Sequence, residues 1–348
     1  MHLGRRPRRL VVLAIGAILV LGVLAGAMRM WVAVATISPT AQPADLLALL
    51  GDGSTQSGSL TSRLDQGQPV NILLLGYGGP AHAGPYLTDS MLLLSLRDHG
   101  HRAALLSIPR DLVARIPALY GGGTITARIN NAYAIGVDRA NFPAVRDQWK
   151  TRTGGGDLAA ATVTDVTGQR VDGWVAVDFA AFRDLVDAVG GVDVNVPTAL
   201  DDPRFPADET TAYTHIHFDA GDQHLNGGRA LEYARSRQTT SDFDRTARQR
   251  TLLVAIRHRL NSLLDAPRLI AALLAVEGDV RTNLRPPALR RLAGVTGGLT
   301  DTHITQVTID PTLLDRVPSP DGNFFLVPKD STHSQLRTSI GASLASAG

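Results

Sequence analysis

The amino-acid sequence predicts an α/β domain of three layers, in which a buried sheet lies between helices. Short apolar runs that are typical of buried strands occur at 70–75, 91–96, 103–108, 175–179 and 192–196. Helical periodicity appears at 182–189, around Ala230, and at 243–264 and 267–276. This mixture of buried strands and helices favours a layered α/β domain over a sandwich or a helix bundle.

The N-terminal 35 residues have the pattern of a membrane anchor. The uninterrupted apolar run at 10–28 would form a helix of roughly 28 Å, about the thickness of the bilayer core. Four arginines precede this run and one follows it, so we expect residues 1–9 to be a cytoplasmic basic tail. The prediction is a single transmembrane helix at 10–35, with the remaining chain extracytoplasmic. A cleaved signal peptide is the alternative, because AGA at 25–27 fits an A-x-A cleavage pattern.

The composition of the remaining chain indicates its domain organisation and excludes some classes of site and partner. Residues 36–67 are rich in Ser, Thr, Gly, Gln and Pro and are expected to form a flexible tether, followed by one domain at 68–346. The absence of cysteine excludes disulfides and thiolate metal sites. A net charge of +2 indicates no strongly basic class, and an extracytoplasmic domain argues against nucleic acid as the partner.

The strongest functional signal is the stretch at 231–250, LEYARSRQTTSDFDRTARQR, which contains five arginines. Arg235 and Arg237 leave the end of an expected helix at 226–233. Arg245 and Gln249 share one helical face with apolar residues further along, so both should point inward at the start of the helix. Asp242 stands at the position of an N-cap.

An arginine that points inward needs a counter-charge. For Arg245 this is either a carboxylate of the chain, Asp242 or Asp244, or an anionic ligand at the helix N-terminus.

Further charged residues stand at the ends of expected strands. Arg110 and Asp111 follow the strand at 103–108, and Asp89 precedes the one at 91–96. Ligands of open α/β sheets collect at the carboxyl ends of strands. Several arginines with a few acids fit a di-anionic or pyrophosphate ligand together with a divalent cation. The residues alone therefore predict an extracytoplasmic, phosphate-binding α/β domain.

Three other motifs are interpreted as ordinary surface features. The glycine-rich runs YGGGT at 120–124 and TGGGD at 153–157 lack the Lys-Ser/Thr of a phosphate loop, and surface loops are expected at both. His215 and His217 lack further ligands at metal-binding spacing, so we expect exposed histidines on a strand.

Seven motifs occur in a specific order: NILLLG (71–76), LTDSM (87–91), SIPRDL (107–112), RINNAYAIG (128–136), VDGWVAVDFAAFRDLVDAVGGVDVNVP (171–197), GDQHLNGGRALEYARSR (221–237) and DFDRTARQR (242–250). In this order they resemble the LytR-CpsA-Psr family of bacterial cell-envelope proteins. The resemblance runs from about 71 to 249, and SIPRD, YARSR and DFDRxxRQ together make it specific.

The resemblance implies a central mixed sheet between helices, with a deep apolar groove that holds a polyprenyl chain. It implies a membrane-anchored enzyme that transfers a glycopolymer from a polyprenyl-pyrophosphate carrier to a cell-wall acceptor, usually peptidoglycan. The implied catalytic residues are Arg110, Arg235, Arg237, Arg245 and Asp242. The implied substrate-binding residues are Gln249, Asp111 and Arg248. Asp89 would bind Mg²⁺ or Mn²⁺.

Two positions depart from the family pattern, which indicates either a divergent branch with a different substrate or a weakened enzyme. Leu87 stands where an arginine is usual two residues before Asp89, and Gly78 stands where the Gly-x-Asp motif has its aspartate. His82, in the loop between them, is expected to be a solvated loop histidine rather than a substitute. The alternatives to a transferase are therefore a polyprenyl-phosphate-binding regulatory or scaffold protein that does not catalyse, and a lipid pyrophosphatase.

Overall fold

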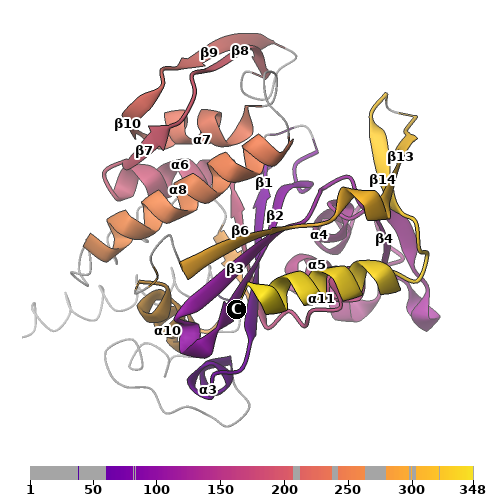
Figure 1. The fold of residues 1–348 in the computed structure, drawn as a ribbon. Helices are drawn as coiled ribbons and strands as arrows, with labels where there is room; N and C mark the ends of the chain where they lie inside the picture. The colour runs from indigo at the N-terminus through magenta and orange to yellow at the C-terminus, as the bar shows by residue number, and fades with distance from the viewer. Residues whose placement is uncertain are drawn as a thin grey trace, which may run out of the picture.

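A six-stranded mixed sheet lies at the centre of the structure (Figure 1). The computed structural model describes residues 38, 60–80, 82, 84–206, 212–236, 242–262, 280–297, 299, 303–320 and 322–347. The strand order is β11 (Val280–Thr282), β6 (Gly173–Asp178), β1 (Val70–Tyr77), β2 (Thr88–Arg97), β3 (Arg102–Ser107) and β12 (Ile304–Thr308). The β1–β6 and β3–β12 pairs are parallel, and the other neighbours are antiparallel. The predicted α/β class, with a mixed sheet between helices, is confirmed.

One face of this sheet is sealed by three helices, α4 (Asn131–Val137), α5 (Gly154–Thr167) and α11 (Ser334–Ser346). Alternate strand residues point into this layer, and Leu73, Leu93 and Leu106 are fully buried there. The burial follows from the period of two along each strand, which sends every second side chain to the same face.

The opposite face is covered less completely. It packs with α3 (Leu60–Asp65) and α10 (Pro286–Gly297), while Leu74, Leu94 and Val175 stay half-buried. α3 falls within the stretch expected to be a tether, but its Leu64 is fully buried against the sheet. The structure therefore packs residues 60–65 with the domain.

A second, smaller core lies beside the sheet and carries the arginine-rich stretch (Figure 1). Its elements are α6 (Phe179–Ala188), β7 (Val192–Val196), β8 (Leu200–Pro206), β9 (Tyr213–Phe218), β10 (Gly221–Leu225), α7 (Gly227–Arg235) and α8 (Asp242–Ser262). β7 pairs with β10 and β8 with β9. Leu252 and Ile256 of α8 are buried in this core, as their spacing predicted. α8 begins at Asp242 itself, so Asp242 is its first helical residue rather than the residue before it.

Two hairpins and four short turns complete the described elements. β4 (Val113–Ile116) pairs with β5 (Ile125–Arg128), and β13 (Leu314–Pro318) pairs with β14 (Phe324–Pro328). The β13–β14 hairpin extends from the body of the domain (Figure 1). The 3₁₀ turns are η1 (Asp98–Gly100), η2 (Tyr120–Gly122), η3 (Asp147–Trp149) and η5 (Pro311–Leu313).

Of the two glycine-rich runs, one forms a surface loop, as predicted, and the other begins a helix. Gly121 and Gly122 have positive φ in an exposed turn, which confirms a surface loop there. The loop expected at 153–157 is wrong, because three glycines form the buried first turn of α5. A Cβ on Gly154 would lie 1.7 Å from the carbonyl oxygen of Trp149, so close backbone packing is the reason for glycine at this position.

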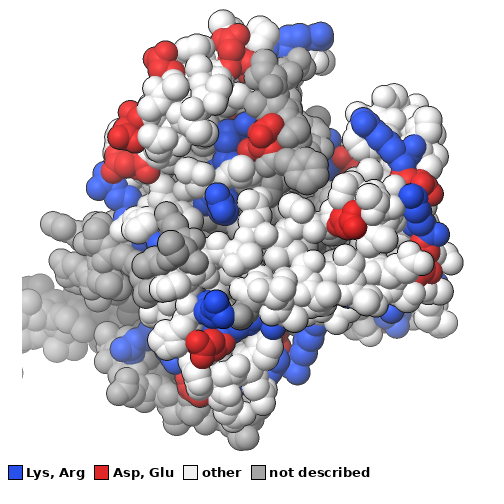
Figure 2. Space-filling model, in the orientation of Figure 1, with Lys and Arg blue, Asp and Glu red and all other residues white. Residues whose placement is uncertain are grey.

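The histidines of β9 are exposed, as predicted. His215 Nε2 lies 2.7 Å and His217 Nδ1 lies 3.1 Å from the same oxygen of Asp201. Acidic side chains lie along this outer rim of the smaller core (Figure 2). In the part of the chain that the structure describes, no group of three or more His, Cys, Asp or Glu side chains is arranged to hold a metal.

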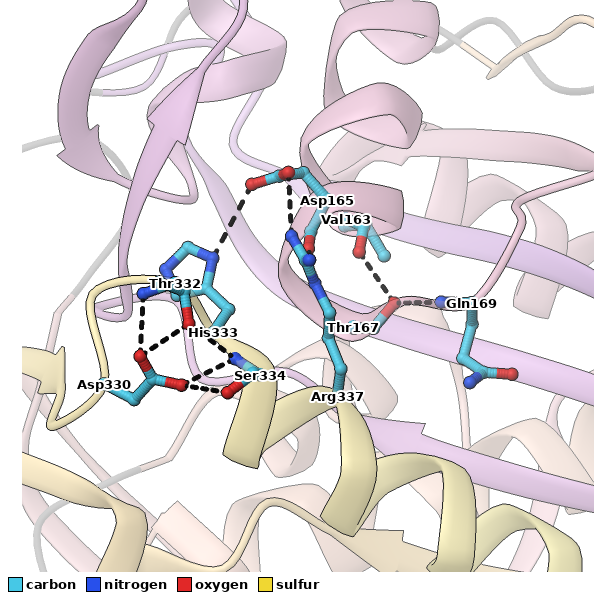
Figure 3. Close-up of polar contacts among 9 residues, drawn as sticks. All are labelled: Val163, Asp165, Thr167, Gln169, Asp330, Thr332, His333, Ser334 and Arg337. Carbon is cyan, nitrogen blue, oxygen red and sulfur yellow. Dashed lines mark hydrogen bonds and ion pairs between the residues drawn. The ribbon is translucent and has the colours of Figure 1, made fainter.

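A polar network caps the N-terminus of α11 and ties this helix to α5 (Figure 3). Asp330 accepts hydrogen bonds from the backbone N–H groups of Thr332 (2.9 Å) and Ser334 (2.8 Å). Hydrogen bonds from the side chains of Ser334 and Thr332 hold the pKa of Asp330 far below its usual value. From the first turn of α11, Arg337 donates to the carboxylate of Asp165 in α5 at 2.9 Å. The C-terminal helix is therefore fixed on the sealed side of the sheet.

The predicted membrane anchor at 10–35 lies outside the described residues. Among those that are described, no helix is both long and apolar enough to cross a bilayer.

Candidate functional site

The predicted site residues gather at one end of the central sheet. β1 ends at Tyr77, which pairs with Thr88 at the start of β2 and with Asp178 at the end of β6. β3 ends next to them, at Ser107. The carboxyl ends of three strands and the loops that follow them thus meet at one edge, the usual place for a ligand in an open α/β sheet.

Arg110 is held at this edge by carboxylates. It forms an ion pair with Asp89 of β2, and its Nε lies 3.6 Å from Asp111 Oδ2. Arg128, at the end of β5, binds the other oxygen of Asp111 at 3.2 Å. The Arg110 side chain is 23% exposed, so an anion can reach it. Sequence reasoning missed Arg128, although this residue opens the RINNAYAIG motif.

Gln249 connects the two parts of the site. Its side-chain oxygen accepts a hydrogen bond of 3.0 Å from the hydroxyl of Ser90, the neighbour of Asp89 in β2. Its amide nitrogen lies 3.5 Å from the carbonyl oxygen of Ala234, the neighbour of Arg235 in α7. The first turns of α8 are thus held against both the strand that carries Asp89 and the helix that carries Arg235.

Arg235 extends from the last turn of α7 over two aromatic rings. Its guanidinium carbon lies 4.5 Å from the ring centroid of Phe179 and 5.3 Å from that of Phe205. One guanidinium nitrogen lies 3.5 Å from Nε2 of His82. The His82 ring also packs edge-on against Phe179, with centroids 5.4 Å apart. His82 lies in a loop, as expected, but it is half-buried rather than fully solvated, because Phe179 of α6 and Arg235 of α7 contact its ring.

Arg248 lies in the interior of the smaller core, only 7% exposed. Its guanidinium donates hydrogen bonds to the carbonyl oxygens of Tyr233 (2.9 Å) and Ser236 (2.5 Å). Burial lowers the pKa of Arg248, and it raises the pKa of Tyr233 beside it. The hydroxyl of Ser236 in turn donates to the buried carboxylate of Asp202 at 2.8 Å. This geometry favours support of the end of α7 over contact with a substrate.

The remaining predicted residues are placed only in part. Arg245 is half-buried and precedes Gln249 by one helical turn on the same face of α8. Arg237 lies outside the described residues, and only the helical backbone of Asp242 is described. The structure thus brings Arg110, Arg235 and the Arg245 face of α8 to one end of the sheet, while convergence of Arg237 stays a prediction.

The fold and the site can now be compared with known proteins. The LytR_cpsA_psr family model matches residues 49–339. The chain belongs to this family.

Relatives within the LytR_cpsA_psr family have transferase names. The chain is 28% identical over 276 residues to the polyisoprenyl-teichoic acid–peptidoglycan teichoic acid transferase TagV of Bacillus subtilis strain 168, a match that covers 78% of this chain and 64% of that protein. It is 32% identical over 230 residues to TagU of Bacillus mycoides strain KBAB4, a transferase of the same description; this match covers 66% of the chain and 64% of TagU. The chain therefore spans just under two thirds of the length of these curated relatives.

The crystal structure of B. subtilis TagV supports the fold. It aligns with a TM-score of 0.58 at 27% identity and covers 80% of this chain and 98% of that one.

The two departures from the family pattern, Gly78 and Leu87, each fit a local packing contact. A Cβ on Gly78 would lie 2.5 Å from both Cβ and Cγ of His82, so the place of a side chain at 78 is filled by the histidine. Leu87 packs against the turn at Gly84, where a Cβ would lie 2.8 Å from Leu87 Cδ1. An apolar residue at position 87 therefore fits a local contact.

Asp89 is the candidate metal ligand of this LytR_cpsA_psr domain. Its side chain is 37% exposed and is paired with Arg110. Protein Mg²⁺ sites often use only one or two carboxylates, with substrate phosphates supplying further oxygens. Asp89 therefore fits a metal that is shared with a bound diphosphate, although Gly78 supplies no second carboxylate.

Proposed function

We propose that this chain is a phosphotransferase that moves a glycopolymer from a polyprenyl-pyrophosphate carrier to a cell-wall acceptor such as peptidoglycan. The names of the TagV and TagU relatives support this activity. The observation that carries the proposal is the meeting of Arg110, from the loop after β3, with Arg235, from α7, at one end of the sheet. Gln249 joins the two elements there through Ser90 and Ala234.

The geometry suits phosphoryl transfer, which depends mainly on positioning and on neutralising the charge that develops on the phosphoryl oxygens. The guanidinium groups of Arg110, Arg235 and Arg245 bind diphosphate oxygens from different sides. Asp111 and Arg128 hold Arg110 in position. Mg²⁺ held by Asp89 would supply further neutralisation of the diphosphate.

The polyprenyl chain would lie along the less covered face of the sheet. Gly76 and Ser90 pair across β1 and β2 at the site end of this face, and Leu74 and Leu92 pair one step further on. Leu94 continues the same apolar surface and is half-buried. A lipid whose diphosphate is held near Ser90 would therefore run toward the half-buried Leu74 and Leu94, and this surface is the proposed apolar groove.

The proposed location is the cell membrane, with a single pass at 10–35 and the basic tail in the cytoplasm. This topology places the domain outside the cytoplasm, where a cell-wall acceptor is found. The observations that support it are the apolar run and the arginines that precede it.

The test uses the full-length chain in lipid nanodiscs. It is incubated with a polyprenyl-pyrophosphate oligosaccharide that is labelled in the sugar, with Mg²⁺ and with peptidoglycan fragments. We expect label to appear on the peptidoglycan, and Arg110→Ala to transfer it about a hundredfold more slowly or worse, because a preorganised charge donor is lost. Arg115→Ala is the matched control, since Arg115 is exposed on β4, and it should retain the wild-type rate.

Other outcomes identify the alternatives. Lipid that binds but never transfers its label would favour a regulatory or scaffold protein. Label released as a free sugar phosphate, without an acceptor, would favour a lipid pyrophosphatase.

A further inference from the structure

We infer that His82 is the general base of this site, the group that takes the proton from the attacking acceptor hydroxyl. The inference rests on the proposed transferase function and names a catalytic residue for it.

The ring of His82 is held in a fixed position by its surroundings. The absence of a side chain at Gly78 leaves space for this ring. A Cβ at position 78 would lie 2.5 Å from Cγ and 2.7 Å from Nδ1 of His82. Phe179 contacts the ring edge-on from the start of α6, with centroids 5.4 Å apart. His82 is therefore packed against the end of β1 and the beginning of α6, next to Arg235.

The contact with Arg235 defines which ring nitrogen carries the lone pair. Guanidinium nitrogens only donate hydrogen bonds, so Nε2 of His82, 3.5 Å away, is the acceptor. A general base needs a ring nitrogen with a lone pair close to the reacting groups, and Nε2 of His82 lies beside Arg235.

Arg235 also places the reacting phosphate beside this lone pair. When its guanidinium binds a phosphoryl oxygen, the phosphorus lies close to Nε2. A hydroxyl that attacks the phosphorus then comes within hydrogen-bond reach of the imidazole. The 3.5 Å contact in the resting site is long for a hydrogen bond, and an acceptor hydroxyl can replace it at little cost.

Three carboxylates that the structure describes at this end of the sheet are engaged in other contacts. Asp89 pairs with Arg110, and Asp111 pairs with both Arg110 and Arg128. Asp178 is 4% exposed, and its Oδ1 accepts the N–H of Ala181 at 2.7 Å, which caps α6. Each of these three carboxylates already has a positioning or capping role, so none of the three is as well suited as His82 to accept a proton.

The transfer step forms one bond, breaks one bond and moves one proton. The acceptor hydroxyl oxygen forms a bond to the phosphorus that carries the glycopolymer. The bond from that phosphorus to the bridging oxygen breaks, and the polyprenyl monophosphate leaves with the electron pair. The hydroxyl proton passes to Nε2 of His82, and the imidazolium later releases it to solvent.

The experiment compares two substitutions of His82 in the nanodisc transfer assay. We expect His82→Ala to slow transfer by about 10²-fold or more, while binding of the polyprenyl-pyrophosphate carrier stays near the wild-type level. Added imidazole should restore much of the rate, because the small molecule can enter the vacated space and accept the proton. His82→Gln keeps the side-chain volume but supplies no base, so it should be equally slow and should not respond to imidazole. His101→Ala, at an exposed histidine, is the matched control and should transfer at the wild-type rate.

The outcomes separate this inference from the function on which it rests. Wild-type transfer together with undiminished transfer by both His82 variants would overturn the role of His82 and leave the transferase intact. Loss of carrier binding in both variants, without rescue by imidazole, would also overturn it and indicate a packing role. A wild-type protein that transfers no label would remove the proposed function and the inference together.

Discussion

Replacement of Arg248 by methionine tests whether this buried arginine supports the fold or binds substrate. The guanidinium donates to the carbonyl oxygens of Tyr233 and Ser236 in the interior. Each buried carbonyl that loses its donor costs about 1–3 kcal/mol, or roughly 2–6 kcal/mol for the two. The substitution also removes a buried positive charge, whose desolvation lowers the pKa of Arg248 in the wild type. Removal of this charge offsets part of the cost. We therefore expect Arg248→Met to lose about 2–4 kcal/mol of unfolding free energy.

The assay is urea unfolding, followed by tryptophan fluorescence, to which Trp174 contributes from the core, where it is 1% exposed. With a urea slope of about 3 kcal/mol per molar, the unfolding midpoint should fall by about 1 M. Arg250→Met, two residues along the same helix, is the matched control and should stay within about 0.5 kcal/mol of wild type. An unchanged midpoint for Arg248→Met would refute the supporting role. If that variant also lost carrier binding, the role in substrate binding suggested by the family resemblance would be correct.

Three further predictions follow from the described contacts. Gly156→Ala should lower stability by at least about 1–3 kcal/mol, because its Cβ would lie 2.1 Å from a ring carbon of Trp174; a wild-type urea midpoint would contradict this. Asp330 has a depressed pKa in the folded protein, so its contribution to stability is present above its ordinary value of 3.8 and is lost as the pH falls through the folded pKa. The gap in melting temperature between wild type and Asp330→Ala should therefore be constant near neutral pH and shrink in acid. Asp89→Asn should remove the difference in carrier binding between Mg²⁺ and a chelator, and a Mg²⁺ effect that survives this change would exclude Asp89 as the ligand.

The sequence pattern was sufficient for four strands of the central sheet, β1, β2, β3 and β6, and for the face of α8, but it missed the two edge strands β11 and β12. Buried strands are near-continuous apolar runs, and Leu252 and Ile256 follow the helical period, so both signals are local. The start of α5 was mistaken for a loop because three consecutive glycines have poor helix propensity. Their use depends on contacts with Trp149 and Trp174, which come from other elements.

Prediction of the site residues from the sequence has the same limit, because contacts between distant parts of the chain are not visible in it. Arg110 and Asp89 could be predicted because strand ends are visible in the sequence. His82 could not, since its neighbours Phe179 and Arg235 are about one hundred residues or more away along the chain. Arg248 directly precedes Gln249 in the sequence, yet its side chain points into the smaller core. The number of arginines in a stretch does not show which of them point into the core and which point toward the site.

The unequal covering of the two sheet faces has a consequence for how such a domain can diversify. The residues under α4, α5 and α11 are closely packed, so substitutions there cost stability. The half that holds Leu74, Leu94 and Val175 is less tightly packed, and exchanges among apolar residues there alter shape with little loss of stability. In the proposed function, such exchanges would fit one side of the sheet to carriers of different length or saturation, while the other side keeps the protein folded.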